Sequence, residues 1–402
     1  MILNIRPVLS AIKRNPTGAL LVGLQVSITL AVLVNAAWIV HQRVAKIEQP
    51  TGINTRDTFT IAVSGSAKQF NASAAETEDL AYLRSLPGVA AATVADGVPL
   101  TGNGGDTTVW LQPGHRGRFV PSAEISMDIE GIKTLDVPLI AGRNFRPDEI
   151  VPYVPGKIAP SASEAIVTQA LAHALFPHGN ALGKTIYGAV PKTIIGIARN
   201  FMGPQLGAPV YNTIIYPTLP GHGNYYMLLV RTQPGRRDAI LRAAKKHIAA
   251  SHRYGVIVYT QTFATANSLM DSSNRNVAIL LTLVTALMLG VCCLGIFGLT
   301  TFNVGSRTRQ IGTHRALGAR RRDVVTHFLL ENAIILAGGA LLGAILALVI
   351  GEWLTTHYAL PRLNLAYLLV GIVALAVVGE LAAWQPARRA ARIPPSVATR
   401  TV

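Results

Sequence analysis

The sequence predicts an α-helical membrane protein with four transmembrane helices, one before and three after a large inserted α+β domain. Four apolar segments are long enough to cross hydrocarbon, which takes about 20 residues. The 402-residue chain combines a mean hydropathy of +0.38 with a net charge of +16. The positive charge gathers beside the apolar segments, which indicates an anionic membrane surface. Residues 41–276, between the first two segments, alternate strand-like and helix-like patterns.

We expect the four spans at residues 18–40, 277–302, 328–350 and 365–384. A helix is the simplest structure there, because it satisfies its own backbone hydrogen bonds. The first segment could be taken for a signal peptide, since Lys13 and Arg14 precede it. Its apolar run exceeds the about 7–15 residues of a signal sequence, which favours a retained helix. Residues 1–17 are expected to form a cytoplasmic amphipathic segment on the inner surface.

The distribution of lysine and arginine predicts the orientation, because these residues mark cytoplasmic loops. Basic residues are dense in residues 1–17, in the connection 303–327 and in the tail 385–402. The connection 355–364 carries only Arg362. Both termini and the 303–327 connection are therefore expected in the cytoplasm, with the large domain outside.

Residues 41–276 are expected to fold as an extracytoplasmic α+β domain. Apolar alternation indicates strands, and apolar residues three or four apart indicate helices. The expected strands are 57–65, 91–100, 192–201 and 224–234, the expected helices are 75–89 and 235–251, and 163–177 is interpreted as a strand entering a helix. Residues 264–276 are expected to form a helical stalk leading into the second span.

The sequence contains no strong catalytic or nucleotide-binding motif. GNALGKT (179–185) is similar to a phosphate-binding loop, but only three residues separate Gly179 from Gly183, where that loop has four. A structural turn is the favoured interpretation. The ten histidines show no spacing typical of a zinc hydrolase, and no G-x-S-x-G occurs. Cys292 and Cys293 are adjacent in an apolar run, which favours small core residues over a disulfide framework or metal site.

The connection 303–327 holds the most informative stretch, NVGSRTRQIGTHRALGARRRDVV. It carries six arginines against one aspartate. A basic loop suits a cytoplasmic connection, but topology alone does not require the pattern RTRQIG…RALGARR. Gly318 is well placed to end a helix with a left-handed cap. Arg320, Arg321 and Arg322 are expected near lipid headgroups, mainly as anchors of the third span.

This stretch resembles the cytoplasmic loop of MacB/FtsX-like ABC transporter permeases, which typically reads close to R-T-R-E-I-G-I-R-R-A-L-G-A. Further segments resemble the MacB-type periplasmic core domain and the closing motif of the family; they are 83–102, 132–145, 163–186 and PARRAARIPPSVATR at 386–400. The matches occur in order along nearly the whole chain. Gln310 stands where the family often has Glu, and Thr313-His314 replaces a branched–basic pair. These departures leave open an altered ATPase contact or neutral drift.

The resemblance implies a non-catalytic permease subunit in a bacterial inner membrane. A separate nucleotide-binding subunit would bind ATP and Mg and hydrolyse the ATP, and the permease would convert that energy into movement of its outer domain, a mechanism called mechanotransmission. The implied export substrate is a drug, a peptide or a lipid-linked molecule. The alternative is a non-transporting signal transducer that activates an extracytoplasmic partner such as a cell-wall hydrolase. A membrane enzyme with an outer catalytic domain is disfavoured.

The resemblance also implies partners and a docking site. The expected partners are the ABC ATPase subunit, a second copy of this permease or a related permease, a periplasmic adaptor protein and membrane lipid, with no nucleic acid. The implied ATPase-docking coupling helix comprises Arg307, Arg309, Gln310, Ile311, Gly312, Arg315, Ala316, Leu317, Gly318 and Ala319. Its arginines are always charged and suit carboxylates on a partner. No cofactor or metal is expected in this chain itself.

Within the spans, small residues and carboxylates are the candidates for special roles. Gly290, Gly295, Gly298, Gly339 and Gly343 allow close helix approach, either at a dimer face or in internal packing. Glu380 is an intramembrane carboxylate and hence a functional candidate. The alternative is that Glu380 reaches toward Arg388 or Arg389. Glu331 is expected as an interfacial anchor at the start of the third span.

Overall fold

The computed structural model describes residues 16–66, 70–152, 162–204, 209–219, 224–358 and 361–394. The chain divides into two compact units. The first, here called the membrane unit, comprises Met1–Glu48 and Asn274–Val402, and the second, the inserted domain, comprises Gln49–Ser273. Most of the predicted entry segment 1–17 lies outside the described residues, as does the end of the 385–402 tail.

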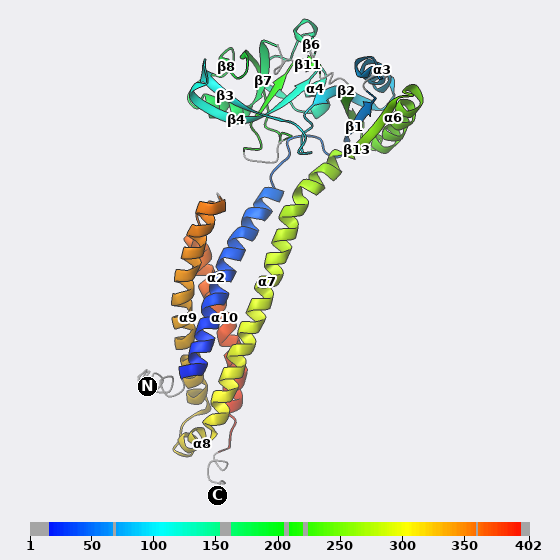
Figure 1. Cartoon of the computed structure of the whole chain (residues 1–402). Helices are drawn as coiled ribbons and strands as arrows, with labels where there is room; N and C mark the ends of the chain where they lie inside the picture. Colours follow the sequence, from blue (N-terminus) through cyan, green and yellow to red (C-terminus); the bar gives the residue numbers. More distant parts are fainter. Residues whose placement is uncertain are drawn as a thin grey trace. The chain divides into compact units, whose positions relative to one another are not determined.

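Four helices of the described chain are long and apolar enough to cross a membrane (Figure 1). They are α2 (Pro16–Ile47), α7 (Phe263–Ser306), α9 (Arg321–Tyr358) and α10 (Leu365–Ala390). One precedes the inserted domain and three follow it, which confirms the predicted fold class. Each helix contains its expected span and extends beyond it at one end or both, because hydropathy marks the length in hydrocarbon and not the helix end. Residues 264–276, predicted as a stalk, continue into α7 without a break.

The interior of the membrane unit is organised around α2, which packs against α9 and α10 (Figure 1). Val26, Leu30 and Val34 recur at helical spacing and are fully buried. They join side chains of α7, α9 and α10 in one apolar cluster. Asn35 also lies in this interior, and its Nδ2 donates to the carbonyls of Ala31 at 2.9 Å and Ala347 at 3.1 Å. These bonds satisfy the buried amide donor, which would otherwise be costly.

The inserted domain is α+β, as predicted. Its strands are β1 (Thr58–Gly65), β2 (Val89–Asp96), β3 (Gly105–Gln112), β4 (Arg116–Met127), β5 (Leu139–Gly142), β6 (Val151–Pro152), β7 (Glu164–Thr168), β8 (Thr185–Tyr187), β9 (Pro191–Ala198), β10 (Thr213–Tyr216), β11 (Thr218–Leu219), β12 (Tyr225–Thr232) and β13 (Gly255–Thr262). Its helices are α3 (Ala72–Ser85), α4 (Gly131–Leu135), α5 (Gln169–Leu175) and α6 (Arg237–Ser251), with a 3₁₀ turn at Pro147–Glu149.

One part of the domain is an antiparallel sheet of β2, β12, β1 and β13, packed against α3 and α6. Phe59, Ile61 and Val63 alternate along β1 and all face these helices. The helix predicted at 75–89 begins earlier, because the side chain of Asn71 caps it by accepting from Ala74 N at 3.1 Å. The strand predicted at 91–100 ends at Asp96, because Gly97 turns the chain with φ +85°.

A second part is a closed ring of strands. β4, β3, β8, β9, β7 and β10 pair in succession, and β10 returns to pair with β4 in parallel. The ring encloses an apolar cluster that includes Val120, Ile194 and Ile214. The 179–185 stretch, considered above as a phosphate loop, passes through a turn at Gly183 (φ +76°) into β8. That placement agrees with a structural turn.

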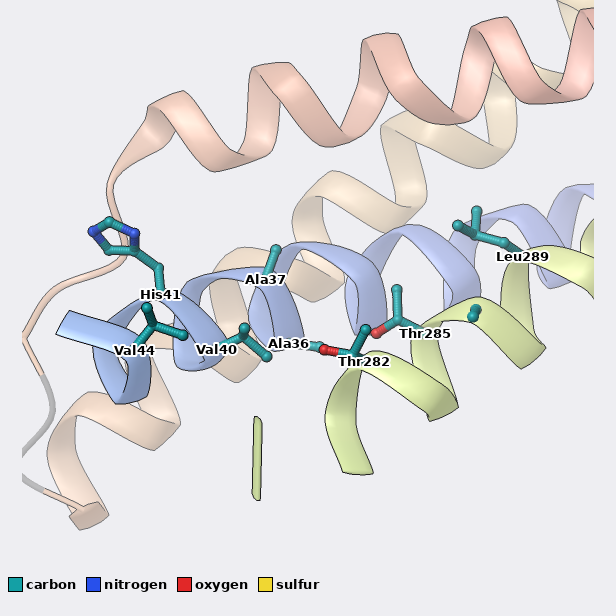
Figure 2. Close-up of a pocket in the computed structure, with 9 residues that line it drawn as sticks. Ala36, Ala37, Val40, His41, Val44, Thr282, Thr285 and Leu289 are labelled. Carbon is teal, nitrogen blue, oxygen red and sulfur yellow. The ribbon is translucent and has the colours of Figure 1, made fainter. Parts of the chain in front are cut away.

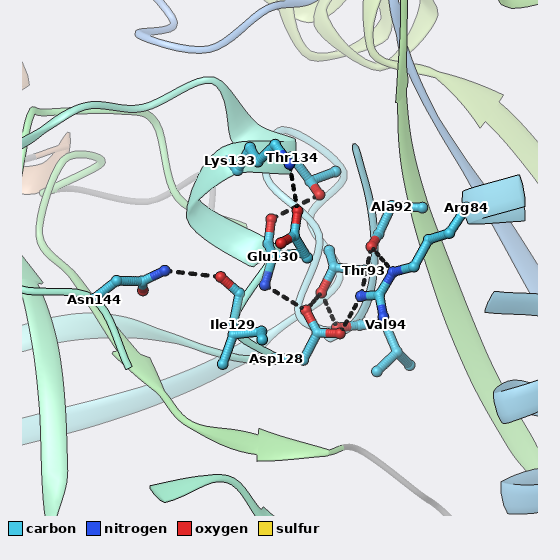
Figure 3. Close-up of polar contacts among 10 residues, drawn as sticks. All are labelled: Arg84, Ala92, Thr93, Val94, Asp128, Ile129, Glu130, Lys133, Thr134 and Asn144. Atoms are coloured by element: carbon cyan, nitrogen blue, oxygen red, sulfur yellow. Dashed lines mark hydrogen bonds and ion pairs between the residues drawn. The ribbon is translucent and has the colours of Figure 1, made fainter. Parts of the chain in front are cut away.

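The two parts meet where β2 pairs with β4, at Ala95 and Met127. Figure 3 shows the polar cluster beside this junction. Arg84 of α3 donates to Asp128 Oδ2 at 2.5 Å and to the Ala92 carbonyl at 2.8 Å. Thr93 donates to the other oxygen of Asp128 at 2.6 Å. The cluster therefore ties α3, β2 and the end of β4 together.

Candidate functional site

The candidate site is the connection between α7 and α9, which contains the short helix α8 (Thr308–Ala316). Gly318 follows it with φ +98°. The amide of Gly318 donates to the Arg315 carbonyl at 3.2 Å, and that of Ala319 donates to the His314 carbonyl at 3.1 Å. This is the left-handed cap expected for a glycine after a helix. It reverses the chain so that α9 begins at once.

One side of α8 is buried against the ends of two long helices. Ile311 and Gly312 are the buried residues of α8. Ile311 belongs to an apolar cluster with Phe328 of α9 and Ala387 and Ala390 of α10. We predicted Ile311 and Gly312 as part of a surface for the ATPase, but the structure places them inside the membrane unit.

Two of the predicted docking arginines are also engaged within the chain. Arg307 Nη1 donates to Glu331 Oε2 at 2.9 Å, and Nη2 donates to Oε1 at 3.3 Å. The side chain of Arg315 donates to the carbonyl of Ile393, just beyond α10. Glu331 is only 4 % exposed. It is thus a buried ion-pair partner and not a simple interfacial anchor.

The other side of the connection is exposed. Its outward residues are Arg309, Gln310, Thr313, His314, Ala316, Leu317 and Gly318, with Ala319 half-buried. Leu317 is the extreme case, with 82 % of its surface exposed. Arg320, Arg321 and Arg322 follow and are exposed as well. The ten predicted docking residues thus divide between an internal face and an external face. No sequence pattern revealed that division, because helical spacing alone does not say which side meets the protein.

The glycines predicted for close helix packing fall into two groups. A Cβ on Gly339 would lie 2.7 Å from the Gly23 carbonyl oxygen, and one on Gly343 would lie 2.8 Å from that of Ser27. Both therefore serve the α2–α9 contact inside one chain. A Cβ on Gly295 of α7 would lie 2.3 Å from Gln25 Oε1 of α2, whereas Gly290 and Gly298 of α7 face open space.

Glu380 of α10 has a partner that we did not predict. Asn332 of α9 donates from Nδ2 to Glu380 Oε1 at 3.1 Å and to the Gly379 carbonyl at 3.3 Å. Arg388, one of the two arginines proposed for Glu380, lies over the Trp384 ring at 4.9 Å. The intramembrane carboxylate is therefore held by an amide on the neighbouring helix.

A groove also lies between α2 and α7 (Figure 2). It encloses about 540 Å³ and is lined by Ala36, Ala37, Val40, His41, Val44, Thr282, Thr285, Ala286 and Leu289. The hydroxyls of Thr282 and Thr285 donate to carbonyls of their own helix, both at 2.7 Å. The groove is therefore mainly apolar and lacks the converging polar groups of a catalytic pocket. The described residues also show no group of metal-ligating side chains.

Comparison with known proteins agrees with this architecture. The model of the family described as FtsX-like permease C-terminal matches residues 282–395, which contain α8, α9, α10 and most of the membrane part of α7. The macrolide export ATP-binding/permease protein MacB of Chromobacterium violaceum is 28 % identical over 234 residues. Its Escherichia coli K12 counterpart is 28 % identical over 232 residues. Residues 282–395 thus match the FtsX-like permease family, and the chain is similar to MacB-type ABC transporter permeases.

The sequence similarity covers part of each curated relative. The alignment spans 55 % of this chain and 35 % of the C. violaceum protein. A probable export ATP-binding/permease protein of Pseudomonas fluorescens is 25 % identical over 270 residues, which is 63 % of this chain and 40 % of the relative. The chain thus spans less than half the length of these curated relatives. The solved periplasmic region of MacB from Actinobacillus actinomycetemcomitans aligns over 56 % of this chain and 98 % of that region, at 12 % identity and a TM-score of 0.37.

Proposed function

We propose that this permease couples ATP hydrolysis by an ABC ATPase to movement of its inserted domain. In this proposal the ATPase contacts the external face of the α8 connection. The carrying observation is that Leu317 is 82 % exposed at the tip of a helix whose opposite face is buried against α9 and α10. An apolar side chain among arginines fits a partner groove that has an apolar pocket and acidic walls.

The orientation follows from charge. Arg309, Arg320, Arg321 and Arg322 cluster on the same connection, which supports a cytoplasmic α8 by the positive-inside rule. Both termini then lie in the cytoplasm of a bacterial inner membrane, and the inserted domain lies outside. The ATPase and the moving domain are on opposite sides, so the long helices must carry the signal.

The remaining parts of the proposal rest on the relatives. We propose that the partner ATPase binds the ATP and Mg, that the permease is itself non-catalytic, and that it works beside a second permease copy or a related permease. The curated relatives are named as export proteins. We therefore favour export of a drug, peptide or lipid-linked molecule, together with a periplasmic adaptor, over activation of an extracytoplasmic hydrolase.

A substitution at the exposed tip tests the contact. Leu317→Asp places a carboxylate on the external face and should lower the amount of ABC ATPase that copurifies from native membranes by about tenfold or more, which corresponds to about 1.4 kcal/mol. Gln385→Asp, on an exposed residue near the end of α10, is the matched control and should copurify normally. The readouts are vanadate-sensitive ATP hydrolysis and mass spectrometry of the purified complex. Equal copurification of both variants would refute the docking proposal.

A further inference from the structure

The ion pair between Arg307 and Glu331 joins the junction of α7 and α8 to the next helix of the chain, α9. Arg307 stands at the junction where α7 ends and α8 begins. Glu331 lies 24 residues later in the sequence, on α9, and is nearly fully buried. The two nitrogens of one guanidinium reach the two oxygens of one carboxylate. Such a bidentate contact fixes orientation as well as distance.

The next residue of α9 continues the connection to α10. Asn332 donates to Glu380 and to the Gly379 carbonyl, both on α10. Two consecutive buried residues of α9 therefore bind two different elements: Glu331 binds the α7–α8 junction and Asn332 binds α10. Buried polar groups are expensive unless paired, so each bond resists displacement of the helix that it holds.

α8 has further attachments along its length. Ile311, in its first turns, packs against Phe328 and Ala387, and Arg315 at its end donates to the Ile393 carbonyl. Among these attachments the Arg307–Glu331 contact is the ion pair, and it lies at the end of α8 that follows α7. Exposed Arg309, two residues on, offers a natural comparison.

We infer that Arg307 and Glu331 are positioning residues that hold α8 rigidly on α9. A partner that displaces α8 then moves α9 and α10 with it, instead of bending a flexible loop. The fixing of α8 stands on the contacts themselves, and the transmission of movement rests on the proposed function.

The position of α8 can be measured without any partner. In the full chain with Cys292→Ala and Cys293→Ala, reconstituted in nanodiscs, a reporter cysteine is introduced by Ile311→Cys or Leu317→Cys. A soluble maleimide should label the exposed position 317 fast and the buried position 311 slowly. Arg307→Gln or Glu331→Gln should then raise labelling at position 311 by tenfold or more. Arg309→Gln, the matched control, should leave it unchanged.

A charge exchange separates positioning from general loss of structure. Arg307→Glu combined with Glu331→Arg should restore slow labelling at position 311, because the pair is re-formed with the signs reversed. A third reporter, Ala383→Cys in the buried interior of the unit, should stay unlabelled throughout. Slow labelling of position 311 in both single variants would overturn the inference, as would fast labelling that the exchange fails to reverse.

Coupling is measured separately in the complex with the ATPase. If α8 is released, ATPase copurification should persist while stimulation of ATP hydrolysis by the permease falls by fivefold or more. Full stimulation in variants with a released α8 would overturn the transmission step. Absence of any ATPase from the wild-type complex would defeat the proposed function and leave the labelling result intact.

Discussion

At the scale of single residues, the inserted domain contains a buried carboxylate that sequence patterns did not reveal. Asp79 of α3 is fully buried and accepts from Tyr226 Oη at 2.5 Å, and it lies 2.9 Å from His252 Nε2. Burial and the neighbouring carboxylate raise the pKa of Tyr226, so its hydroxyl stays protonated and donates. These contacts join α3, β12 and the end of α6 around one carboxyl group.

Lys192 is the second unusual residue, because it is a buried lysine inside the ring of strands. Its Nζ donates to the Ala162 carbonyl at 2.6 Å and lies 4.5 Å from the centre of the Tyr216 ring. Burial lowers the pKa of Lys192 from 10.5 to about 8, opposed by Glu124 and Glu164. The folded state therefore disfavours the charged form relative to the unfolded chain.

This shift predicts a pH dependence of stability. Between pH 8 and 10.5 the unfolded chain binds more protons than the folded domain, so the Lys192 contribution to the free energy of unfolding should rise with pH. The rise should reach about 3 kcal/mol at most. Lys192→Met should abolish it, whereas Lys184→Met, at an exposed lysine, should not. Pulse proteolysis of the full chain in urea at both pH values measures the difference, and equal pH slopes in all three proteins would contradict it.

At the scale of elements, the contact between α2 and α9 depends on glycines, whose lack of a side chain lets the two backbones approach closely. Gly339 and Gly343 are one helical turn apart and face the backbone of α2. Gly338, beside them, faces open space. Without a hydrophobic force between helices in lipid, close backbone approach is the main source of packing energy. The Gly-xxx-Gly pattern is therefore used within the chain, and of the five glycines predicted for packing only Gly290 and Gly298 of α7 face open space.

Replacing one glycine should have a strongly position-dependent effect. Gly339→Leu forces side-chain atoms against the Gly23 carbonyl and Val26, both under 3 Å from the new Cβ. We expect a loss of about 1–3 kcal/mol or more from overpacking, seen as a lower thermal unfolding midpoint in detergent. Gly338→Leu differs by one position and should leave the midpoint nearly unchanged. A similar loss in both variants would show that the α2–α9 contact is not the cause.

At the scale of the whole molecule, the chain starts in the membrane unit, passes through the inserted domain and returns to the membrane unit. α2 ends at Ile47, just before the inserted domain, and α7 begins at Phe263 within it, so these two helices connect the units along the chain. In the most apolar stretch of each helix, 39 % of the residues of α2 are buried, compared with 11 % of those of α7. Exposed apolar side chains along α7, such as Leu283, Leu287 and Leu294, suit contact with lipid or with another transmembrane helix.

The proposed orientation predicts opposite accessibility for two exposed residues. In the background without native cysteines, Val256→Cys in the inserted domain should react with an impermeant maleimide added to cells whose outer membrane is opened. Leu317→Cys should react only after the inner membrane is also permeabilised. Reversed labelling would place α8 outside and would remove the basis for an ATPase contact there.

Part of the candidate site was predictable and part was not. The stretch around Arg307 to Ala319 identified the connection, and Gly318 correctly indicated where α8 ends. The sequence did not separate Ile311 from Leu317, although one is buried and the other exposed. Glu331 lies 24 residues from Arg307, and Ile393 lies 78 from Arg315. Contacts between residues that distant depend on how the helices pack and leave no local pattern.

The sequence by itself determined the number and order of the spans, because about 20 apolar residues must bury a helix in hydrocarbon whatever surrounds it. It also determined the helix-ending role of Gly318, because positive φ strains other residues. Only the tertiary structure decided which glycines pack inside the chain, which partner holds Glu380, and which arginines point outward. Each of those depends on the rotation and register of one helix against another, which are set by the sum of many weak contacts across the whole membrane unit.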